Sequence, residues 1–249
     1  MEIAGDDPAA VRLVLAVRGG DIAELSALLA QDPGMATARL VGKDGGSRTA
    51  LHVVTDWPGY FPRGPQSARL LLSAGADPDE RTTGRGGQSG EGTETPLHWA
   101  ASSDDAEVAA VLIDGGADIE APRGSIGTPL ANAVGYACWS VGRLLVERGA
   151  RVEALWQAAA LGLTGRLVEL VEERTPLDSD EVSQAFWHAC AGGQRRTADF
   201  LLEMGADINW VPDYAQGTPL DAARGEGTQR ENVISWLLES GAQSGQDGR

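Results

Sequence analysis

The chain carries a pattern of apolar positions that recurs roughly every 34 residues. In its clearest copy, Thr95–Ala101 is followed by the apolar pairs Val108-Ala109 and Leu112-Ile113 and then by Gly116-Ala117-Asp118. Apolar residues spaced three to four positions apart form one face of a helix, so this copy predicts two short helices joined by a tight turn. Thr is a favourable N-cap and Pro suits the first helical turn, whereas Gly after the second helix closes it in the left-handed conformation.

Further copies, some of them degenerate, cover nearly the whole chain. Thr49-Ala50-Leu51, Thr128-Pro129-Leu130 and Thr218-Pro219-Leu220 begin three of them, and most copies end in Gly-Ala. The first apolar residues of the copies are Leu13, Leu51, Leu97, Leu130, Leu155, Phe186 and Leu220. A unit of this size cannot bury its own apolar face, so the pattern predicts a stack in which each copy packs on its neighbours.

The motif Thr95-Pro96-Leu97-His98, followed by an Ala pair and Gly-Ala-Asp, resembles the ankyrin repeat. Ankyrin repeats have a period of about 33 residues and tetratricopeptide repeats one of about 34, so the content decides between them, and the Trp/Tyr pattern of the second is missing. The resemblance implies an all-α fold, an ankyrin-repeat solenoid of about seven helix-turn-helix repeats with short finger loops instead of a true sheet. We expect a single domain over residues 1–249, with repeats at roughly 8–42, 48–79, 94–121, 127–153, 154–176, 183–210 and 217–243.

Two insertions interrupt the period. Residues 55–65 lengthen the turn between two helices, and residues 80–94 form a Gly-rich extension of a finger loop. The Gly-rich run at 84–92 lacks the closing Gly-Lys-Ser/Thr of a phosphate-binding loop and the last glycine of a nucleophile elbow. Between Leu130 and Leu155 the chain is shorter than one period, which predicts a trimmed finger. Insertions in repeat proteins often lie on the binding face.

The charge balance narrows the classes of partner. The chain has 36 acidic and 20 basic residues, a formal net charge of -16 and a pI of about 4.5. Nucleic-acid binding depends on Lys and Arg that neutralise phosphates, so we expect no nucleic acid as partner, and no anionic membrane surface. An acidic chain attracts basic partners at long range, and the alternative is that the charge serves solubility alone.

Composition also suggests a compartment and a source. The first ten residues lack an apolar signal core, and no run of about 18 apolar residues could span a membrane. The two cysteines, Cys138 and Cys190, fall in repeats two apart, too far for a disulfide. We therefore expect a cytoplasmic protein, more readily a monomer than an oligomer. Lys43 is the only lysine among 20 basic residues, a bias typical of GC-rich bacterial genomes such as those of actinomycetes.

The resemblance implies binding through the finger loops and the inner face of each first helix. Rigid aromatic side chains are the usual anchors of protein interfaces. The candidate binding residues are Trp99, Asn132, Tyr136, Gln157, His188, Trp210, Asp213 and Tyr214. The alternative for Trp99 and Tyr136 is that they pad the seams between helices. His52 and His98 belong to the repeat motif, and the resemblance gives them the structural role of tying neighbouring turns together.

His188 allows a second reading of the groove. With Asn132 and Gln157 it would form a polar row, and histidine is the usual general base of enzymes. No acid/base couple, nucleophile arrangement or metal-ligand spacing accompanies it, so we expect no catalytic residues, no metal and no cofactor. The sequence thus predicts a module that binds a partner protein, which is basic, through its concave groove and finger loops. A small-molecule binder or unconventional enzyme that uses the polar row is the alternative.

Overall fold

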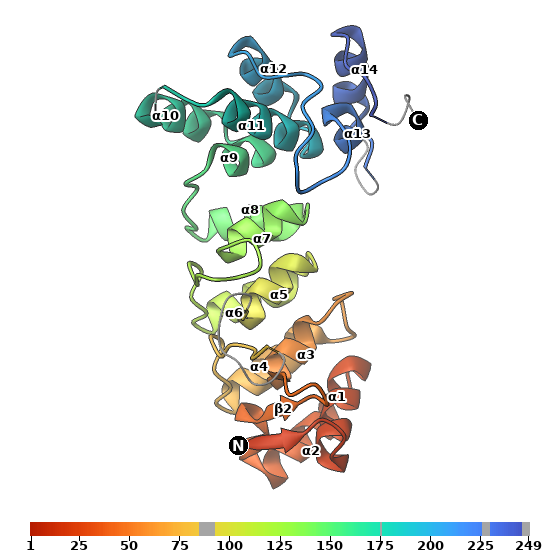
Figure 1. Ribbon diagram of the computed structural model, residues 1–249. Helices are drawn as coiled ribbons and strands as arrows, with labels where there is room; N and C mark the ends of the chain where they lie inside the picture. The colour runs from red at the N-terminus through yellow and green to blue at the C-terminus, as the bar shows by residue number, and fades with distance from the viewer. Residues whose placement is uncertain (85–92, 175, 226–229, 246–249) are drawn as a thin grey trace. The chain divides into compact units, whose positions relative to one another are not determined.

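The computed structural model describes residues 1–84, 93–174, 176–225 and 230–245, and this part of the chain is mostly helical (Figure 1). It contains 14 α-helices and one short 3-10 helix. The predicted all-α architecture of helix-turn-helix repeats is confirmed. The chain divides into two compact units, Met1–Ala150 and Arg151–Arg249. Most of the Gly-rich insertion expected at 80–94 lies outside the described residues.

The first unit consists of four helix pairs. They are α1 (Pro8–Gly19) with α2 (Ile22–Gln31), α3 (Ala50–Thr55) with α4 (Gly64–Ser73), α5 (Pro96–Ser102) with α6 (Ala106–Asp114), and α7 (Pro129–Gly135) with α8 (Trp139–Glu147). The 3-10 helix η1 (Pro33–Thr37) follows α2. In three of these pairs, Thr49, Thr95 and Thr128 are the N-cap residues of the first helix, as the sequence predicts.

In the first unit, equivalent helices of successive pairs pack against each other. The first helices α1, α3, α5 and α7 contact one another in chain order, and so do the second helices α2, α4, α6 and α8 (Figure 1). Leu51 of α3, Leu97 of α5 and Leu130 of α7 are buried between the layers. Ala100 and Ala101 are fully buried as well, and their small side chains let neighbouring helices approach closely. The core of the unit is therefore continuous from repeat to repeat.

A small three-stranded sheet lies at the N-terminal end of the first unit. Its order is β1 (Glu2–Ala4), β2 (Arg39–Val41) and β3 (Ser47–Arg48), with β1 parallel and β3 antiparallel to β2. The register places Ile3 opposite Leu40. Strands of two or three residues are too short to produce a readable alternation of apolar and polar positions, which is why the sequence predicted loops alone.

The second unit consists of three helix pairs. They are α9 (Leu155–Leu161) with α10 (Thr164–Arg174), α11 (Ser179–Ala191) with α12 (Arg195–Glu203), and α13 (Pro219–Ala223) with α14 (Glu231–Glu239). Helix α11 packs against both α9 and α13, and buried Phe186 lies at its middle. None of the helices within the described ranges of either unit combines the length and apolar character that crossing a membrane requires.

Candidate functional site

Two buried histidines tie the second repeat of the first unit to the third and the third repeat to the fourth. Nδ1 of His52 accepts a hydrogen bond from the backbone N–H of Thr49, and its Nε2 lies 3.0 Å from the carbonyl oxygen of Glu94. Because Nδ1 accepts, Nε2 carries the proton and donates to that carbonyl. His98 repeats the arrangement with Thr95 and, at 3.1 Å, with the carbonyl oxygen of Gly127. The structural role predicted for these histidines is confirmed.

Burial keeps these histidines neutral. The desolvation of His52 lowers its pKa to about 4, and burial also lowers the pKa of His98. Their imidazoles are therefore uncharged hydrogen-bond bridges at neutral pH. The ring of His52 also meets the indole of Trp99 edge-on, with the ring centroids 5.1 Å apart, so the same histidine helps to fix Trp99.

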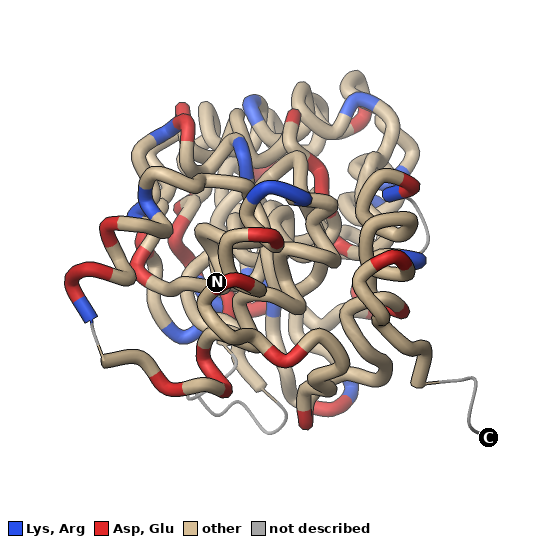
Figure 2. The backbone as a smooth tube through the Cα atoms, turned by 90° about the horizontal axis from the view of Figure 1, so that it is seen from above, with Lys and Arg blue, Asp and Glu red and all other residues tan. Residues whose placement is uncertain are grey.

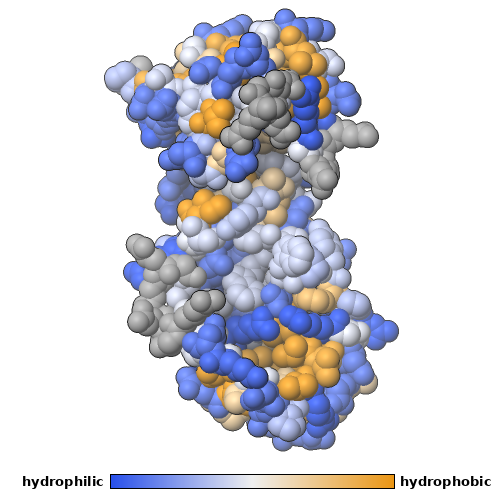
Figure 3. All heavy atoms as spheres, turned by 45° about the vertical axis from the view of Figure 1, so that its right-hand side comes forward, coloured by the Kyte–Doolittle hydropathy of each residue, from blue (hydrophilic) through white to orange (hydrophobic). Residues whose placement is uncertain are grey.

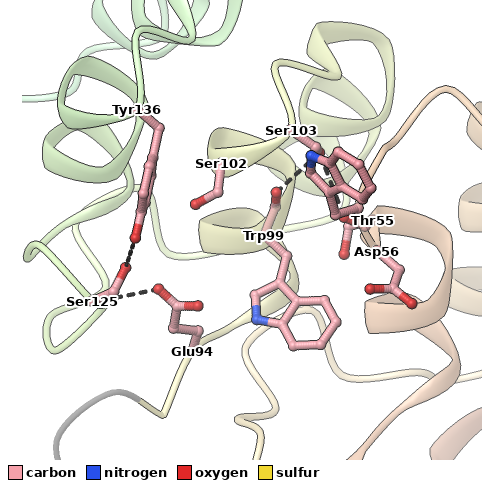
Figure 4. A pocket seen from close by; sticks show the side chains of 9 residues that line it. Thr55, Asp56, Glu94, Trp99, Ser102, Ser103, Ser125 and Tyr136 are labelled. Atoms are coloured by element: carbon pink, nitrogen blue, oxygen red, sulfur yellow. Dashed lines mark hydrogen bonds between the residues drawn. The ribbon is translucent and has the colours of Figure 1, made fainter.

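A pocket of about 270 Å³ opens beside Trp99 in the first unit. Three consecutive repeats line it (Figure 4). The end of α3 and the loop after it contribute Thr55–Trp57. Helix α5 and the residues just outside it contribute Glu94, Trp99, Ser102 and Ser103, and the next repeat contributes Ser125 and Tyr136. The pocket thus brings together three aromatic and two acidic side chains.

Two of the aromatic walls are open to solvent. Trp57 is 79% exposed and Tyr136 is 50% exposed, while Trp99 is half-buried. Figure 4 shows the carboxylate of Glu94 between Tyr136 and the indole of Trp99. Exposed aromatic side chains that lie together around one pocket are typical of interaction sites, whereas single exposed apolar residues are common on any protein surface.

A hydrogen-bond network fixes the acidic side of the pocket. Oε1 of Glu94 accepts from the backbone N–H of Ser125 at 2.8 Å and from Nδ2 of Asn132 at 2.7 Å. Oγ of Ser125 lies 3.1 Å from the hydroxyl oxygen of Tyr136 (Figure 4). Asn132 itself is fully buried, and its Oδ1 accepts from the backbone N–H of Ile126 at 3.1 Å. Asn132 therefore holds Glu94 in position from the protein interior, and it is not one of the residues that line the pocket.

The loop that carries Trp57 is fixed at both of its ends. Asp56 pairs with Arg18 and Arg48. Tyr60 donates its backbone N–H to Asp105 and its hydroxyl to the carbonyl of Asp104, at 3.0 Å and 2.6 Å. These contacts hold the inserted turn against the helices on either side.

Glycine is required at Gly59, within that loop. Its φ is +78°, and an added Cβ would lie 3.1 Å from Cβ of Ser103. Any larger residue would thus combine an unfavourable backbone conformation with a close contact. The position of Trp57 therefore depends on the backbone conformation at Gly59 as well as on the ion pairs of Asp56.

The two carboxylates of the pocket differ in their charge balance. Asp56 forms ion pairs with two arginines, whereas Glu94 forms no ion pair with any residue in the described ranges. Acidic and basic positions are otherwise intermixed along the backbone, with acidic ones in excess (Figure 2). On the face drawn in Figure 3, hydrophobic side chains form separate patches among hydrophilic ones. Glu94 is thus an uncompensated negative charge beside aromatic rings.

The second unit holds His188 in an aromatic cluster. Its ring lies 5.1 Å from Trp156, 5.0 Å from Trp187 and 6.2 Å from Tyr214, measured between centroids. Nε2 of His188 lies 3.1 Å from the hydroxyl oxygen of Tyr214, and Nδ1 has no hydrogen-bond partner in the described part of the chain. Burial lowers the pKa of His188 to about 4.

Gln157 is buried at the start of α9. Its Oε1 accepts from the backbone N–H groups of Glu153 and Ala154, each at 3.2 Å, so it performs the capping task of His52 and His98. Asn132, Gln157 and His188, which the sequence placed in a polar row, are thus all buried, Asn132 in the first unit and the other two in the second. Each supports its neighbours within its own unit.

The last finger presents the other candidates of the second unit. Asp213 and Tyr214 are exposed, and Trp210 is half-buried. The hydroxyl of Tyr214 accepts from Nε2 of Gln184 at 3.2 Å, which holds the phenol ring over α11.

Sequence reasoning missed Trp57 and Glu94 as site residues. Trp57 lay inside the recognised insertion at 55–65, and this was the one signal that could have found it. Glu94 directly precedes the cap Thr95, and nothing in the sequence separates it from other loop carboxylates. No group of three or more potential metal ligands occurs within the described residues, and both cysteines are free and buried.

Several known proteins and one family model are similar to this chain. Residues 94–123 match the family model of the ankyrin repeat. The human ASB11 ankyrin repeat domain has 19% identity and a TM-score of 0.51, over 90% of this chain and 96% of that domain. The ankyrin repeat domain of Bcl-3, described as a unique member of the IkappaB protein family, has 24% identity and a TM-score of 0.49, over 92% of this chain and 97% of that domain. Among curated proteins, none matches this sequence at a significant level. The family match falls on the copy with the clearest motif.

Proposed function

Because residues 94–123 match the ankyrin repeat and the chain has the fold of an ankyrin repeat domain, we propose that it is a module that binds another protein and that the pocket beside Trp99 is the centre of the contact. Solenoid repeats in general offer extended surfaces to their partners. The observation that carries the proposal is the exposure of Trp57 and Tyr136 around the uncompensated carboxylate of Glu94. Exposed aromatics on a rigid scaffold are the usual anchors of protein interfaces.

The proposed partner is basic. The net charge of -16 produces a field that draws cationic surfaces toward the chain and repels nucleic acids and anionic membranes. Glu94 supplies a local charge of the same sign at the pocket. Binding of such a partner should weaken as salt is added, because exposed charges are screened over about 8 Å at physiological ionic strength.

The remaining candidates have different parts in this proposal. Trp99 and Tyr136 contact the partner in the first unit, and Trp210, Asp213 and Tyr214 do so on the last finger of the second. Asn132, Gln157 and His188 are buried, so they hold the contact residues in place. The single domain, the monomeric state, the cytoplasmic location and the bacterial source stay predictions.

No observation favours the alternative of a small-molecule binder or unconventional enzyme. A general base has to reach a proton of its substrate, and the rings of Trp156, Trp187 and Tyr214 surround His188, which is 5% exposed. The alternative also stays a prediction.

The experiment is an affinity capture with the full chain. Wild type, the pocket variant Trp99→Ala/Tyr136→Ala and the control Leu238→Ala are immobilised and exposed to an extract of the native cells. Leu238 is an exposed apolar residue of α14, outside the proposed contact surface. Circular dichroism first establishes that all three keep their helices. We expect one basic protein to bind wild type and control and to be lost from the pocket variant. A partner retained equally by all three chains would contradict the proposal.

A further inference from the structure

We propose that the pocket beside Trp99 binds one arginine side chain of the partner, with the guanidinium stacked on the aromatic rings and bonded to Glu94. The inference rests on the proposed protein-binding function and specifies the chemical group that the pocket recognises.

The aromatic walls suit a cation. Trp57, Trp99 and Tyr136 line one cavity, and the electron-rich faces of such rings attract positive charge. Trp99 is fixed by the ring of His52, and Tyr136 is fixed by Ser125. The rings of Trp99 and Tyr136 are thus positioned before a ligand arrives, so these two side chains have little rotamer freedom to lose on binding.

One oxygen of Glu94 is available to a ligand. Both internal donors, the N–H of Ser125 and Nδ2 of Asn132, bond to Oε1. Within the described residues no donor bonds to Oε2. The carboxylate borders the cavity, where a cationic N–H group would find a charged acceptor that is already oriented (Figure 4).

The other acceptors favour arginine over lysine. The hydroxyls of Ser102 and Ser103 donate to the carbonyls of His98 and Trp99. The Ser102 oxygen also accepts from Nδ2 of Asn132 at 3.3 Å, so it keeps one lone pair, and both hydroxyls can still accept from a ligand in the cavity. A guanidinium carries five N–H donors in a plane and stacks on aromatic faces, whereas an ammonium is a compact, strongly hydrated charge with three donors. Several acceptors beside flat rings therefore match a guanidinium better.

The charged side chains that line the pocket favour a cationic ligand. Asp56 is already paired with Arg18 and Arg48, and no basic side chain lines the described pocket. Glu94 is therefore the lining carboxylate that has no ion pair among the described residues. A cationic group can pair with it, whereas it would repel a phosphate or carboxylate ligand.

The test uses a small probe on the full chain. The tripeptide acetyl-Gly-Arg-Gly-amide is titrated into ¹⁵N-labelled protein, and the indole N–H signals of Trp57 and Trp99 are followed by NMR after assignment with Trp57→Phe and Trp99→Phe. We expect both signals to shift with the arginine peptide and to saturate. The citrulline peptide has nearly the same shape without the charge, and its affinity should be lower by at least about tenfold. The lysine and trimethyl-lysine peptides should also bind more weakly than arginine.

Two charge-removing variants separate recognition from folding. Glu94→Gln keeps an oxygen that accepts from Ser125 and Asn132 but places an amide where the open oxygen was, so the fold is kept and affinity for the arginine peptide should fall about tenfold. Glu147→Gln removes the same charge at the exposed end of α8 and should leave the affinity unchanged. Equal binding of the citrulline and arginine peptides, a stronger response to either lysine peptide, or equal loss in both variants would overturn the inference.

The outcomes also separate this inference from the proposed function. A captured protein that is lost with Trp99→Ala/Tyr136→Ala but retained with Glu94→Gln, without any arginine-peptide shift, would overturn the arginine inference alone. In another outcome, the arginine peptide binds saturably but the captured partner binds every pocket variant as well as it binds wild type. That outcome would support the pocket chemistry and contradict the proposed contact surface.

Discussion

Asn132 donates a hydrogen bond to Glu94 across two neighbouring repeats, with Nδ2 2.7 Å from Oε1. Asn132 belongs to α7, whereas Glu94 precedes α5. The same amide accepts from the backbone N–H of Ile126 through its Oδ1. A fully buried side chain thus sets the position of a carboxylate at the pocket, and stability and recognition share one group.

The first prediction concerns this shared group. Asn132→Ala removes the donor to Glu94 and leaves the N–H of Ile126 without its acceptor, so we expect the free energy of unfolding to fall by about 2–3 kcal/mol. Ser125→Ala removes only an exposed hydroxyl contact to Tyr136 and should cost less than about 1 kcal/mol. Urea denaturation followed by circular dichroism measures both. Similar losses in the two variants would show that burial of Asn132 does not decide its contribution.

The second prediction concerns pH. Burial lowers the pKa of His188 to about 4, below the ordinary value of 6.5, so between these pH values the unfolded chain binds a proton that the folded chain refuses. The stability associated with neutral His188 is complete above pH 6.5 and is lost as the pH falls toward 4. For one such histidine the loss between pH 7 and pH 5 is about 2 kcal/mol.

His188→Gln tests that prediction directly. The variant lacks the titrating ring, so its unfolding free energy should fall less than that of wild type between pH 7 and pH 5, by about 2 kcal/mol. The ring protons of His188 in the folded wild type should titrate near pH 4 in NMR spectra. A midpoint near 6.5 would mean that water reaches the ring and that the aromatic cluster does not enclose it.

The sequence predicted those parts of the fold that local chemistry decides. Thr95, Pro96 and His98 each have a favourable place in the first turn of a helix, and α5 begins at Pro96 as expected. Helix α11 shows the limit of that reasoning. It begins at Ser179 after the cap Asp178, ahead of the repeat expected from residue 183, because an N-terminal extension of the helix also buries Val182.

The candidate site was less accessible to sequence reasoning. Whether Asn132 faces solvent or the next repeat depends on its contacts with Glu94 and Ile126, which lie in two other turns. Trp57 reaches the pocket because Tyr60 and Asp56 fix its loop through residues far along the chain. Such tertiary contacts leave no periodic signal, so the sequence recognised Trp99 and Tyr136 but not the two residues that complete the pocket.

The third prediction compares two glycines of the second unit. A Cβ added at Gly192 would lie 2.0 Å from the carbonyl oxygen of Ala160, where α11 passes closely over α9. Because backbone has to move, Gly192→Ala should destabilise the protein by about 2–3 kcal/mol. Gly165 in α10 is exposed and a Cβ there meets nothing within 4 Å, so Gly165→Ala should stabilise by about 0.5–1 kcal/mol. Thermal unfolding should therefore shift in opposite directions, and a loss of stability in Gly165→Ala would contradict this reading of α10.

The last prediction concerns Trp187, which donates its indole N–H to the carbonyl of Gly217 at 3.2 Å. His98 makes the corresponding bond to Gly127 in the first unit, so a different ring performs the same task of fastening a first helix to the next finger. Trp187→Phe keeps most of the ring and removes the donor, whereas Trp156→Phe removes the same atoms without breaking a hydrogen bond found in the described residues. We expect Trp187→Phe to lower the free energy of unfolding by about 1 kcal/mol more than Trp156→Phe, measured by urea denaturation. If the two losses are equal, ring packing alone holds the finger, and the bond to Gly217 adds nothing to the junction between α11 and α13.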